Sequence, residues 1–444
     1  MPRLRTLPIP APSLVVMIGA AASGKSSFCR RNFHPRQIIS SDACRERVSG
    51  DAADQTVTRA AFEMAHRLTE ERLRRGRLTV FDATCVESRA RRTLLDLAER
   101  HHLPAVACVL HLPVEICAEH DRRRPGRRVG RAVIARQARD LARSLRGLRR
   151  EGFVAVHRLR SPEAAAHARV ALVPLPCDRT EDRGPFDIIG DIHGCARELV
   201  LLLHRLGYRR ASPRHPFRHP DGRRAVFLGD LVDRGPRVVE TVRIVIRMAA
   251  AGTALCVPGN HEAALLRCLD GSAATRSPGQ LRSLRQIRAL RQRRRARFIE
   301  ELRAFLGSLP AHLVLDRRRL AVAHAGIKAD QLGRDSATVR RFALKGETTG
   351  EVDQYGLPVR VKWASAYRGR ALVVYGHTPV REPEWIRNTV NIDTGCVYGG
   401  MLTAFRYPER ALVSVRAARA YYRPRPSLPA RIGLRAETRV LPPI

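Results

Sequence analysis

The second half of the chain repeats one pattern, in which a short apolar run ends in carboxylate, histidine or amide side chains. Each run is predicted to form a strand, so its polar residues would lie where open α/β sheets bind ligands, at the strand's carboxyl end. Oxygen and nitrogen donors of these types suit Mn²⁺, iron or Zn²⁺. The sets stand at residues 190–194 (GDIHG), 229–235 (GDLVDRG), 259–262 (GNHE), 324–326 (HAG) and 376–378 (GHT). Because they recur in order at strand ends, they predict a metal centre far more specifically than one histidine would.

The first half carries a phosphate-binding loop. Residues 19–26, GAAASGKS, fit the pattern GxxxxGK[ST] between an apolar run at 14–19 and a helical stretch. Backbone N–H groups of such a loop wrap nucleotide phosphates, and the following helix N-terminus adds a favourable dipole. Lys25 would reach the β- and γ-phosphates, and Ser26 would bind Mg²⁺. The predicted ATP or GTP contacts are Gly19, Gly24, Lys25, Ser26 and Ser27.

A possible acceptor site follows this loop. Asp42 comes shortly after the apolar pair Ile38-Ile39, at the end of a second predicted strand. A carboxylate there could take the proton of a hydroxyl that attacks the γ-phosphate. Arg45 would share a helix face with Asp42 and could hold an acceptor phosphate. The alternative is that Asp42 only caps the following helix.

An arginine run at residues 122–128 (RRRPGRR) is a third candidate element of the first half. Clustered guanidinium groups suit the charge that develops on a transferring phosphoryl group, and Arg124 and Arg127 are the candidate contacts. In a chain this rich in arginine, a solvated turn is the competing interpretation.

Apolar runs at 14–19, 78–82, 105–111 and 153–158 alternate with helical stretches, which is the rhythm of a parallel sheet covered by helices. Prolines, charges and glycine interrupt this rhythm around 174–186 and predict a linker. Residues 281–303 have leucine and isoleucine at helical spacing among many arginines, so we predict an amphipathic surface helix, with RNA contact as a secondary expectation.

Composition favours a polyanionic partner. The 444 residues carry 81 lysines and arginines against 42 acids, a formal net charge of +39. Such a field attracts nucleic acid, although a GC-rich genome also inflates arginine over lysine. The ten cysteines form no CxxC pair and predict reduced, buried thiols. The apolar start runs into the phosphate loop, and no run is long enough to span a bilayer, so we predict a soluble, cytoplasmic protein with no membrane partner.

The second half resembles the calcineurin-like metallophosphoesterase superfamily, and that resemblance supplies roles. Asp230 would bridge two metals, Arg234 would clamp the phosphate oxygens, and His261 would assist the leaving oxygen as general acid. Asp393 would fill the coordination gap where many members have GHxH and this chain has Gly376-His377-Thr378-Pro379. The implied metal ligands are Asp191, His193, Asp230, Asn260, His324, His377 and Asp393.

The phosphate loop, the Asp-x-x-Arg pair at 42–45, the arginine run and residues 81–92 (FDATCVESRARR) resemble the kinase module of bacterial polynucleotide kinase-phosphatases. Cys85 departs from the family's Asp-Ala-Thr-Asn. The resemblance implies α/β architecture, with a P-loop NTPase-type parallel sheet domain followed by an α/β metallophosphoesterase sandwich. It divides the chain into a kinase domain (1–175), a linker (176–186), a phosphoesterase domain (187–420) and a C-terminal tail (421–444).

The same resemblance implies ATP-dependent phosphorylation of 5′-hydroxyl ends and metal-dependent removal of 3′-phosphate, 2′-phosphate or 2′,3′-cyclic phosphate. Its cofactors would be ATP with Mg²⁺ for the kinase and two divalent metals, by expectation Mn²⁺, for the phosphoesterase. The expected partners are RNA or DNA ends, a separate ligase or an RNA 2′-O-methyltransferase, and a second copy in a homodimer. The family's C-terminal ligase domain has no counterpart in the sequence, so the expectation is either that another protein seals the ends or that this chain is a truncated form.

Two other interpretations stay open. The phosphoesterase half also resembles Ser/Thr protein phosphatases and dinucleoside-tetraphosphate hydrolases, so the first half could be a regulatory nucleotide-binding domain. A basic RNA-binding protein with degenerate catalytic modules is a non-enzymatic alternative, against which the intact Lys25, Ser26, Asp42 and metal-ligand set argue.

Overall fold

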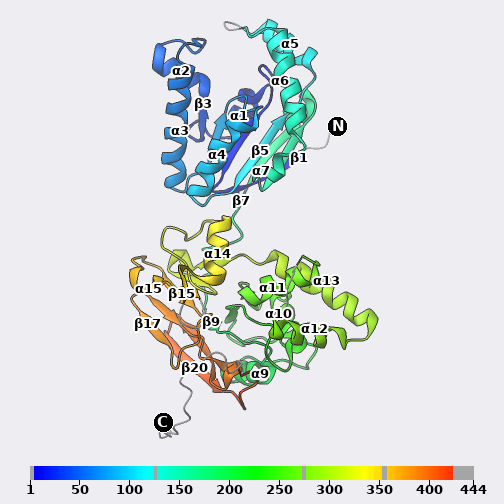
Figure 1. Ribbon diagram of the computed structural model, residues 1–444, viewed down its shortest axis with the longest axis vertical. Coiled ribbons are helices and arrows are strands. Elements are labelled where there is room, and N and C mark those ends of the chain that lie inside the picture. The colour runs from blue at the N-terminus through cyan, green and yellow to red at the C-terminus, as the bar shows by residue number, and fades with distance from the viewer. Residues whose placement is uncertain (1–4, 125–127, 273–276, 353–357, 424–444) are drawn as a thin grey trace. The chain divides into compact units, whose positions relative to one another are not determined.

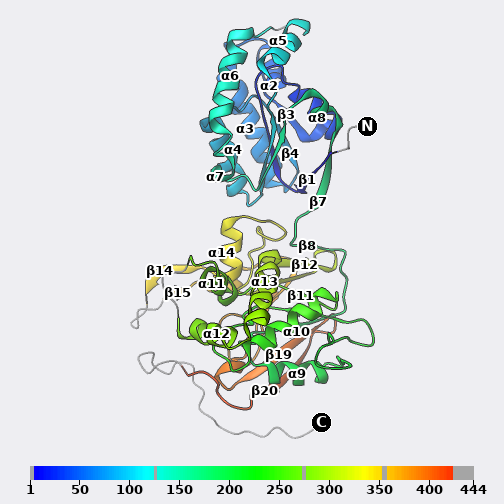
Figure 2. The same cartoon turned by 90° about the vertical axis from the view of Figure 1, so that its right-hand side faces the viewer.

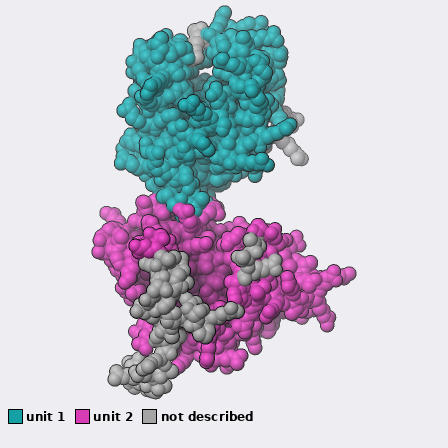
Figure 3. Space-filling model, in the orientation of Figure 1, with its two compact units in different colours: residues 1–175, 334–338 teal, residues 176–333, 339–444 magenta. Residues whose placement is uncertain are grey.

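The computed structural model (Figure 1) describes residues 5–124, 128–272, 277–352 and 358–423. Contacts divide the chain into two compact units, coloured separately in Figure 3. Unit 1 comprises residues 1–175 and 334–338, and unit 2 comprises residues 176–333 and 339–444. The predicted phosphate contact Arg127 and most of the predicted tail (424–444) lie outside the described residues.

Unit 1 is built on a parallel five-stranded sheet, as predicted. Its strand order is β3 (Ile38–Ser40), β4 (Thr79–Asp82), β2 (Leu14–Ile18), β5 (Ala105–Leu110) and β6 (Ala155–Leu159). Side chains of β2 alternate between two hydrophobic clusters, because successive residues of a strand point to opposite faces. Val16 packs with Leu94 of α4 (Ser88–Arg100) on one face, and Val15 packs with Phe28 of α1 (Lys25–Asn32) on the other. Because β2 is buried on both faces, its sequence is a continuous apolar run.

The remaining elements of unit 1 are helices and a separate two-stranded sheet. They are β1 (Arg5–Ala11), α1 (Lys25–Asn32), η1 (Pro35–Gln37), α2 (Ser41–Ser49), α3 (Thr58–Arg74), α4 (Ser88–Arg100), α5 (Val114–Arg123), α6 (Arg131–Ser144), α7 (Leu148–Glu151), α8 (Pro162–His167) and β7 (Ala168–Pro174), of which β1 and β7 pair in parallel.

Unit 2 is a sandwich of two sheets, which confirms the predicted architecture (Figure 2). One sheet has the order β11 (Ala254–Cys256), β10 (Arg224–Phe227), β9 (Phe186–Ile189), β19 (Met401–Tyr407) and β20 (Ala411–Arg416). The other has the order β17 (Glu384–Ile386), β18 (Thr389–Asn391), β16 (Leu372–Tyr375), β13 (Leu320–Ala323), β12 (His312–Leu315) and β8 (Asp178–Arg179). Apolar side chains such as Ile188, Val226 and Val322 fill the space between them.

Helices cover the outer faces of the sandwich. The β9 sheet is covered by α9 (Ala196–Arg205), α10 (Val238–Ala250), α11 (Asn260–Leu269), α12 (Pro278–Arg288) and α13 (Gln292–Ser308), which share one core cluster with it. The β13 sheet packs against α14 (Ala337–Lys345) and α15 (Trp363–Ala366). The remaining elements are β14 (Thr348–Val352), β15 (Pro358–Arg360), η2 (Asp316–Arg318) and η3 (Cys396–Tyr398).

Two sequence expectations differ from the structure. The predicted linker 176–186 contains strand β8, which pairs with β12 and so belongs to unit 2, and Phe186 already begins β9. The single helix predicted over 281–303 is instead two helices, α12 and α13. The helical conformation is interrupted at 289–291, where Leu290 packs against the core.

All ten cysteines are buried free thiols, as predicted. Among the described residues, every helix is too short or too polar to cross a bilayer.

Candidate active sites

The metal-ligand candidates of unit 2 gather at the carboxyl ends of its strands. Asp191 and His193 follow β9, Asp230 follows β10, and Asn260 follows β11. His324 follows β13, and His377 follows β16. Parallel neighbours such as β9 and β10 end at the same sheet edge, so residues far apart in the chain converge there.

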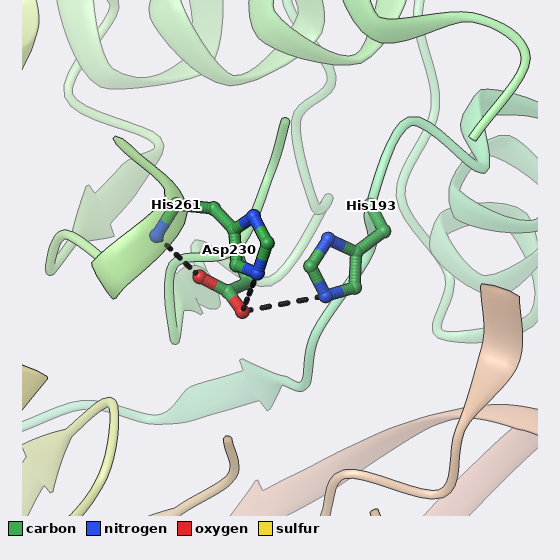
Figure 4. Close-up of side chains that lie close together, drawn as sticks. All are labelled: His193, Asp230 and His261. Atoms are coloured by element: carbon green, nitrogen blue, oxygen red, sulfur yellow. Dashed lines mark hydrogen bonds and ion pairs between the residues drawn. The ribbon is translucent and has the colours of Figure 1, made fainter. Parts of the chain in front are cut away.

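Asp230 stands at the centre of the gathered side chains. Its carboxylate forms one group with His193 and His261 and a second group with His324 and His377, and within each group the potential ligand atoms lie within 4.8 Å of one another. Figure 4 shows the first group, in which both imidazole rings point toward the Asp230 carboxylate. Asp230 Oδ2 lies 3.3 Å from His193 Nε2, and Asp230 Oδ1 lies 3.5 Å from His324 Nε2. One carboxylate thus faces two ligand groups, as a bridging ligand must.

The ligand histidines are oriented by the backbone. His193 Nδ1 lies 2.8 Å from the Val232 carbonyl, and His324 Nδ1 lies 3.0 Å from the Leu228 carbonyl. Because each Nδ1 donates to a carbonyl, each Nε2 keeps its lone pair for a metal. Burial and nearby Arg234 lower the pKa of His193 to about 4, and burial also lowers the pKa of His324. Both rings are therefore neutral at pH 7, the form that binds metals.

Two carboxylates of the site, Asp191 and Asp393, are buried close to Asp230. Asp191 is buried, and its Oδ1 has no hydrogen-bond partner among the described residues. Burial, Asp393 and Asp230 raise the pKa of Asp191 well above its usual range. Burial and Asp230 likewise raise the pKa of Asp393 to about 7. A divalent cation would relieve this repulsion, so the donor set fits metal ions.

Asn260 Oδ1 lies 3.0 Å from His324 Nε2, and His324 Nε2 lies 3.1 Å from His377 Nδ1. The second group of donors is thus compact and includes the predicted amide. Asp393 lies beside Asp191 but outside the two compact groups, so its role as a ligand stays a prediction.

Glu262 holds the two motif loops together. Its buried carboxylate accepts hydrogen bonds from the backbone N–H groups of Asp230, Leu231, Val232 and Gly259, at 2.7 to 3.1 Å. The loop after β11 approaches Asp230 so closely that a Cβ at position 259 would collide with the Asp230 carboxylate. Gly259 and Glu262 therefore fix where the central carboxylate lies.

Replacing Glu262 with glutamine is expected to destabilise unit 2 by about 3 kcal/mol, because an amide NH₂ would face backbone N–H groups and leave buried donors unpaired. Calorimetric unfolding of the full chain should show a lower midpoint and a weaker increase on adding Mn²⁺. Glu240→Gln, which changes an exposed carboxylate of the same unit, is the matched control. Equal midpoints for the two variants would contradict the bracing role.

His261 is held by a buried carboxylate rather than by a carbonyl. Its Nδ1 lies 2.6 Å from Asp233 Oδ2, and Asp233 Oδ1 accepts from the Ser283 hydroxyl at 2.6 Å. Although burial lowers it, the pKa of His261 is raised overall, because Asp230 and Asp233 favour the charged ring. A proton held on His261 suits the predicted role of general acid.

Helix α12 supports this arrangement from outside the motifs. Ser283 also accepts a hydrogen bond from the Asp233 N–H at 2.9 Å, and Gln286 donates to the Gly235 carbonyl at 3.1 Å. The helix begins with a capping box between Ser277 and Gln280, which fixes its first turn. The first part of the segment predicted as an RNA-contacting surface helix therefore supports the loop at residues 229–235, which we call the catalytic loop.

Ser283→Ala is expected to lower the phosphoesterase kcat about tenfold, or 1.4 kcal/mol. The change removes the hydrogen bonds of the Ser283 hydroxyl with the Asp233 carboxylate and with the Asp233 N–H, and so loosens the orientation of His261. Steady-state rates on a small phosphate ester test this expectation. Ser308→Ala, at an exposed position of α13, is the control. A kcat equal to that of the control would show that α12 does not position Asp233.

Arg234 lies beside His193 of the first group. Its guanidinium carbon is 5.5 Å from the Tyr398 ring centroid and 5.9 Å from the Tyr422 centroid, and its Nη1 is 2.7 Å from His193 Nε2. Arg360 has the corresponding place at the second group, with Nη1 2.6 Å from His377 Nε2. Guanidinium groups thus flank both groups, where they can bind phosphate oxygens.

In unit 1 the phosphate loop forms part of a cavity of about 690 Å³. Lys25 begins α1 after Gly24, whose φ of 86° favours glycine, and its Nζ donates to the Gly19 and Ala20 carbonyls. Burial lowers the pKa of Lys25 and raises that of Asp82, which Ser26 contacts through a hydrogen bond. Ser26 and Asp82 form a pair of oxygen donors suited to Mg²⁺.

The acceptor candidates lie in the same cavity. Asp42, Arg45 and Arg124 all line it, and Asp42 forms an ion pair with Arg45 and lies 3.7 Å from Arg124. The cap of α2 is Ser40, whose hydroxyl accepts from the Ala43 N–H. Asp42 is therefore not the helix cap, which removes the simpler interpretation of this residue.

Sequence reasoning missed several of these residues. Asp233 and Glu262 lie inside the recognised motifs, yet their roles depend on contacts that no local pattern reveals. Asp82 follows a buried strand directly, a signal that the sequence offers. Cys85, which departs from the resemblance, is buried with φ 45°, a conformation that asparagine adopts more readily.

Comparison with known proteins supports the two-unit organisation. Residues 14–144 match the AAA domain family, and residues 184–394 match the calcineurin-like phosphoesterase family. An asymmetrical bis(5′-nucleosyl)-tetraphosphatase PrpE of Anoxybacillus flavithermus is 44% identical over 236 residues, which cover 53% of this chain and 96% of the relative. The chain belongs to the calcineurin-like phosphoesterase family. It is an enzyme with a metallophosphoesterase domain, and members of this family use divalent metals.

A second relative of the same name, from Bacillus subtilis, is 41% identical over 238 residues, covering 53% of this chain and 96% of the relative. Among solved structures, a Saccharomyces cerevisiae serine/threonine phosphatase is 14% identical, with a TM-score of 0.35 over 56% of this chain and 84% of that one. The calcineurin-like match lies in the second half of this chain and follows the AAA match, which is the domain order that the sequence predicts.

Proposed function

We propose that unit 2 hydrolyses a phosphate bond of a nucleotide, with a dinucleoside polyphosphate as the substrate that the relatives favour. The observation that carries this proposal is the position of the Asp230 carboxylate, which faces both ligand groups. Relatives more than 40% identical over nearly their whole length are named as asymmetrical bis(5′-nucleosyl)-tetraphosphatases. Arg234 and Arg360 each contact a ligand histidine, so the site offers cations to more than one phosphate.

The ligands would hold two divalent ions, which supply a nucleophilic water and neutralise phosphate charge when bound. Arg234 and Arg360 orient the phosphate oxygens. A bond would form from the water oxygen to phosphorus while the bond to the leaving oxygen breaks, and the proton of the water would be released to solvent. His261, held by Asp233, gives its proton to that leaving oxygen.

A second candidate function is end healing of nucleic acids, and the acceptor site of unit 1 favours it. Asp42 and Arg124 line the same cavity as Lys25, so a hydroxyl beside Asp42 would face the γ-phosphate of bound ATP. Unit 1 would then phosphorylate 5′-hydroxyl ends, and unit 2 would remove phosphate from the other end. A regulatory nucleotide site has no need of an acceptor carboxylate.

One assay separates the two candidates. The full chain with Mn²⁺, Mg²⁺ and ATP is offered diadenosine tetraphosphate or a 5′-hydroxyl, 3′-phosphate RNA oligonucleotide. Release of ATP and AMP from the first substrate alone supports the dinucleoside polyphosphatase. Gain of a 5′-phosphate and loss of the 3′-phosphate on the second supports end healing. Failure on both substrates would overturn the proposal that unit 2 acts on nucleotides.

A further inference from the structure

A second cavity, of about 610 Å³, lies along helix α10 of unit 2 and is rich in arginine. We call it the arginine groove. Only one acidic side chain, Glu240, is among its lining residues, and it lies 3.5 Å from Arg237. The arginines that line the groove are Arg210, Arg214, Arg237, Arg243 and Arg247.

Several of these arginines have unused donors. Within the described residues, the guanidinium groups of Arg210, Arg214 and Arg243 have no hydrogen-bond or ion-pair partner. The guanidinium carbon of Arg210 lies 4.4 Å from the Phe217 ring centroid, and that of Arg243 lies 5.5 Å from the Phe298 ring centroid. Ring contacts fix the face of a guanidinium and leave its N–H edge for an anion. Arginines held in place with free donors are suited to phosphate.

The groove begins beside the catalytic loop and continues along a helix. Arg237 follows Arg234 by three residues, and its N–H donates to the Gly194 carbonyl of the first ligand motif. Gln286 lines the groove and also donates to Gly235. Arg243 and Arg247 then follow one turn apart on α10. Cations spaced along a line suit a polymer of phosphates better than one compact anion.

Apolar side chains line the groove together with the arginines. Pro236, Val239, Ile244 and Leu290 line the same cavity. Unpaired bases can pack on apolar surfaces and on guanidinium planes, whereas the bases of a duplex are already stacked and hidden. The lining therefore favours a single strand over a duplex.

We propose that the arginine groove binds the phosphate backbone of single-stranded nucleic acid. The inference goes beyond the proposed function, because strand binding does not depend on which phosphate bond unit 2 hydrolyses. The net charge of +39 gives the chain a field that draws such a strand to its surface.

The test compares two double variants of the full chain by fluorescence anisotropy with a labelled single-stranded RNA of mixed sequence. Arg214→Gln/Arg237→Gln removes two cations of the groove, and Arg370→Gln/Arg416→Gln removes two exposed cations elsewhere in unit 2. Each lost phosphate contact should reduce the salt slope by about 0.7, so the groove variant should lose about 1.4. At 0.1 M salt each contact is worth about fivefold, so the affinity should fall about 25-fold.

Circular dichroism and the thermal midpoint confirm that both variants fold. A loss of affinity and slope confined to the groove variant supports the proposal, and equal affinities in the two variants overturn it. A raised KM for diadenosine tetraphosphate with unchanged RNA binding would also overturn it, because the groove would then bind a small polyphosphate. Binding is measured without turnover, so these results are independent of whether the proposed function holds.

Discussion

Asp230→Asn should abolish phosphoesterase activity, with a fall in kcat/KM of more than about 10³. Asp230 faces both ligand groups, so one substitution weakens two metal sites at once. An amide keeps the size of the side chain but loses its negative charge, and its NH₂ cannot coordinate a cation. His193 of the first group and His324 of the second lie 3.3 and 3.5 Å from this carboxylate, so each metal site would lose the ligand that the two share.

Rates on diadenosine tetraphosphate and the metal content of the purified chain measure this effect. The variant is expected to retain fewer bound metal ions per chain than the wild type. Asp330→Asn, at an exposed carboxylate of unit 2, is the matched control. Full activity in Asp230→Asn, or full metal content with no activity loss, would remove Asp230 from the centre of the site.

The elements that carry the chemistry could be predicted because their signals are local. A buried parallel strand is a continuous apolar run, and its ligand follows within a few residues, as Asp230 follows β10. The glycine loop before Lys25 is equally local. Strands of both sheets, such as β10 and β13, carry a ligand at the carboxyl end, and these ends converge when the two sheets pack as a sandwich.

The residues that support the ligands could not be predicted in the same way. Ser283 reaches Asp233 across 50 positions of the sequence, and Arg360 reaches His377 from a separate hairpin. Nothing in the local pattern of either residue indicates its partner, because the contact exists only after the helices and strands have packed. The interruption of the helix at 289–291 could not be predicted for the same reason, because the packing of Leu290 against the core is a tertiary contact.

The proposed acceptor site of unit 1 depends on Asp42, whose role the sequence left ambiguous. The sequence left Asp42 as either a helix cap or a proton acceptor. Ser40 is the cap, and Asp42 instead lies between Arg45 and Arg124 in the nucleotide cavity.

Asp42→Asn should therefore lower phosphoryl transfer to a 5′-hydroxyl RNA by about 10² to 10⁴, the usual contribution of a general base. ATP affinity should be unchanged, because Lys25, Ser26 and Asp82 hold the nucleotide side of the cavity. Initial rates measure phosphoryl transfer, and ATP titration measures ATP affinity separately. Asp96→Asn, at an exposed position of α4, is the control. Loss of ATP affinity would place Asp42 in the nucleotide site instead. Unchanged transfer would show that the carboxylate accepts no proton and serves only to hold the arginines, so the two arginines alone would define the acceptor.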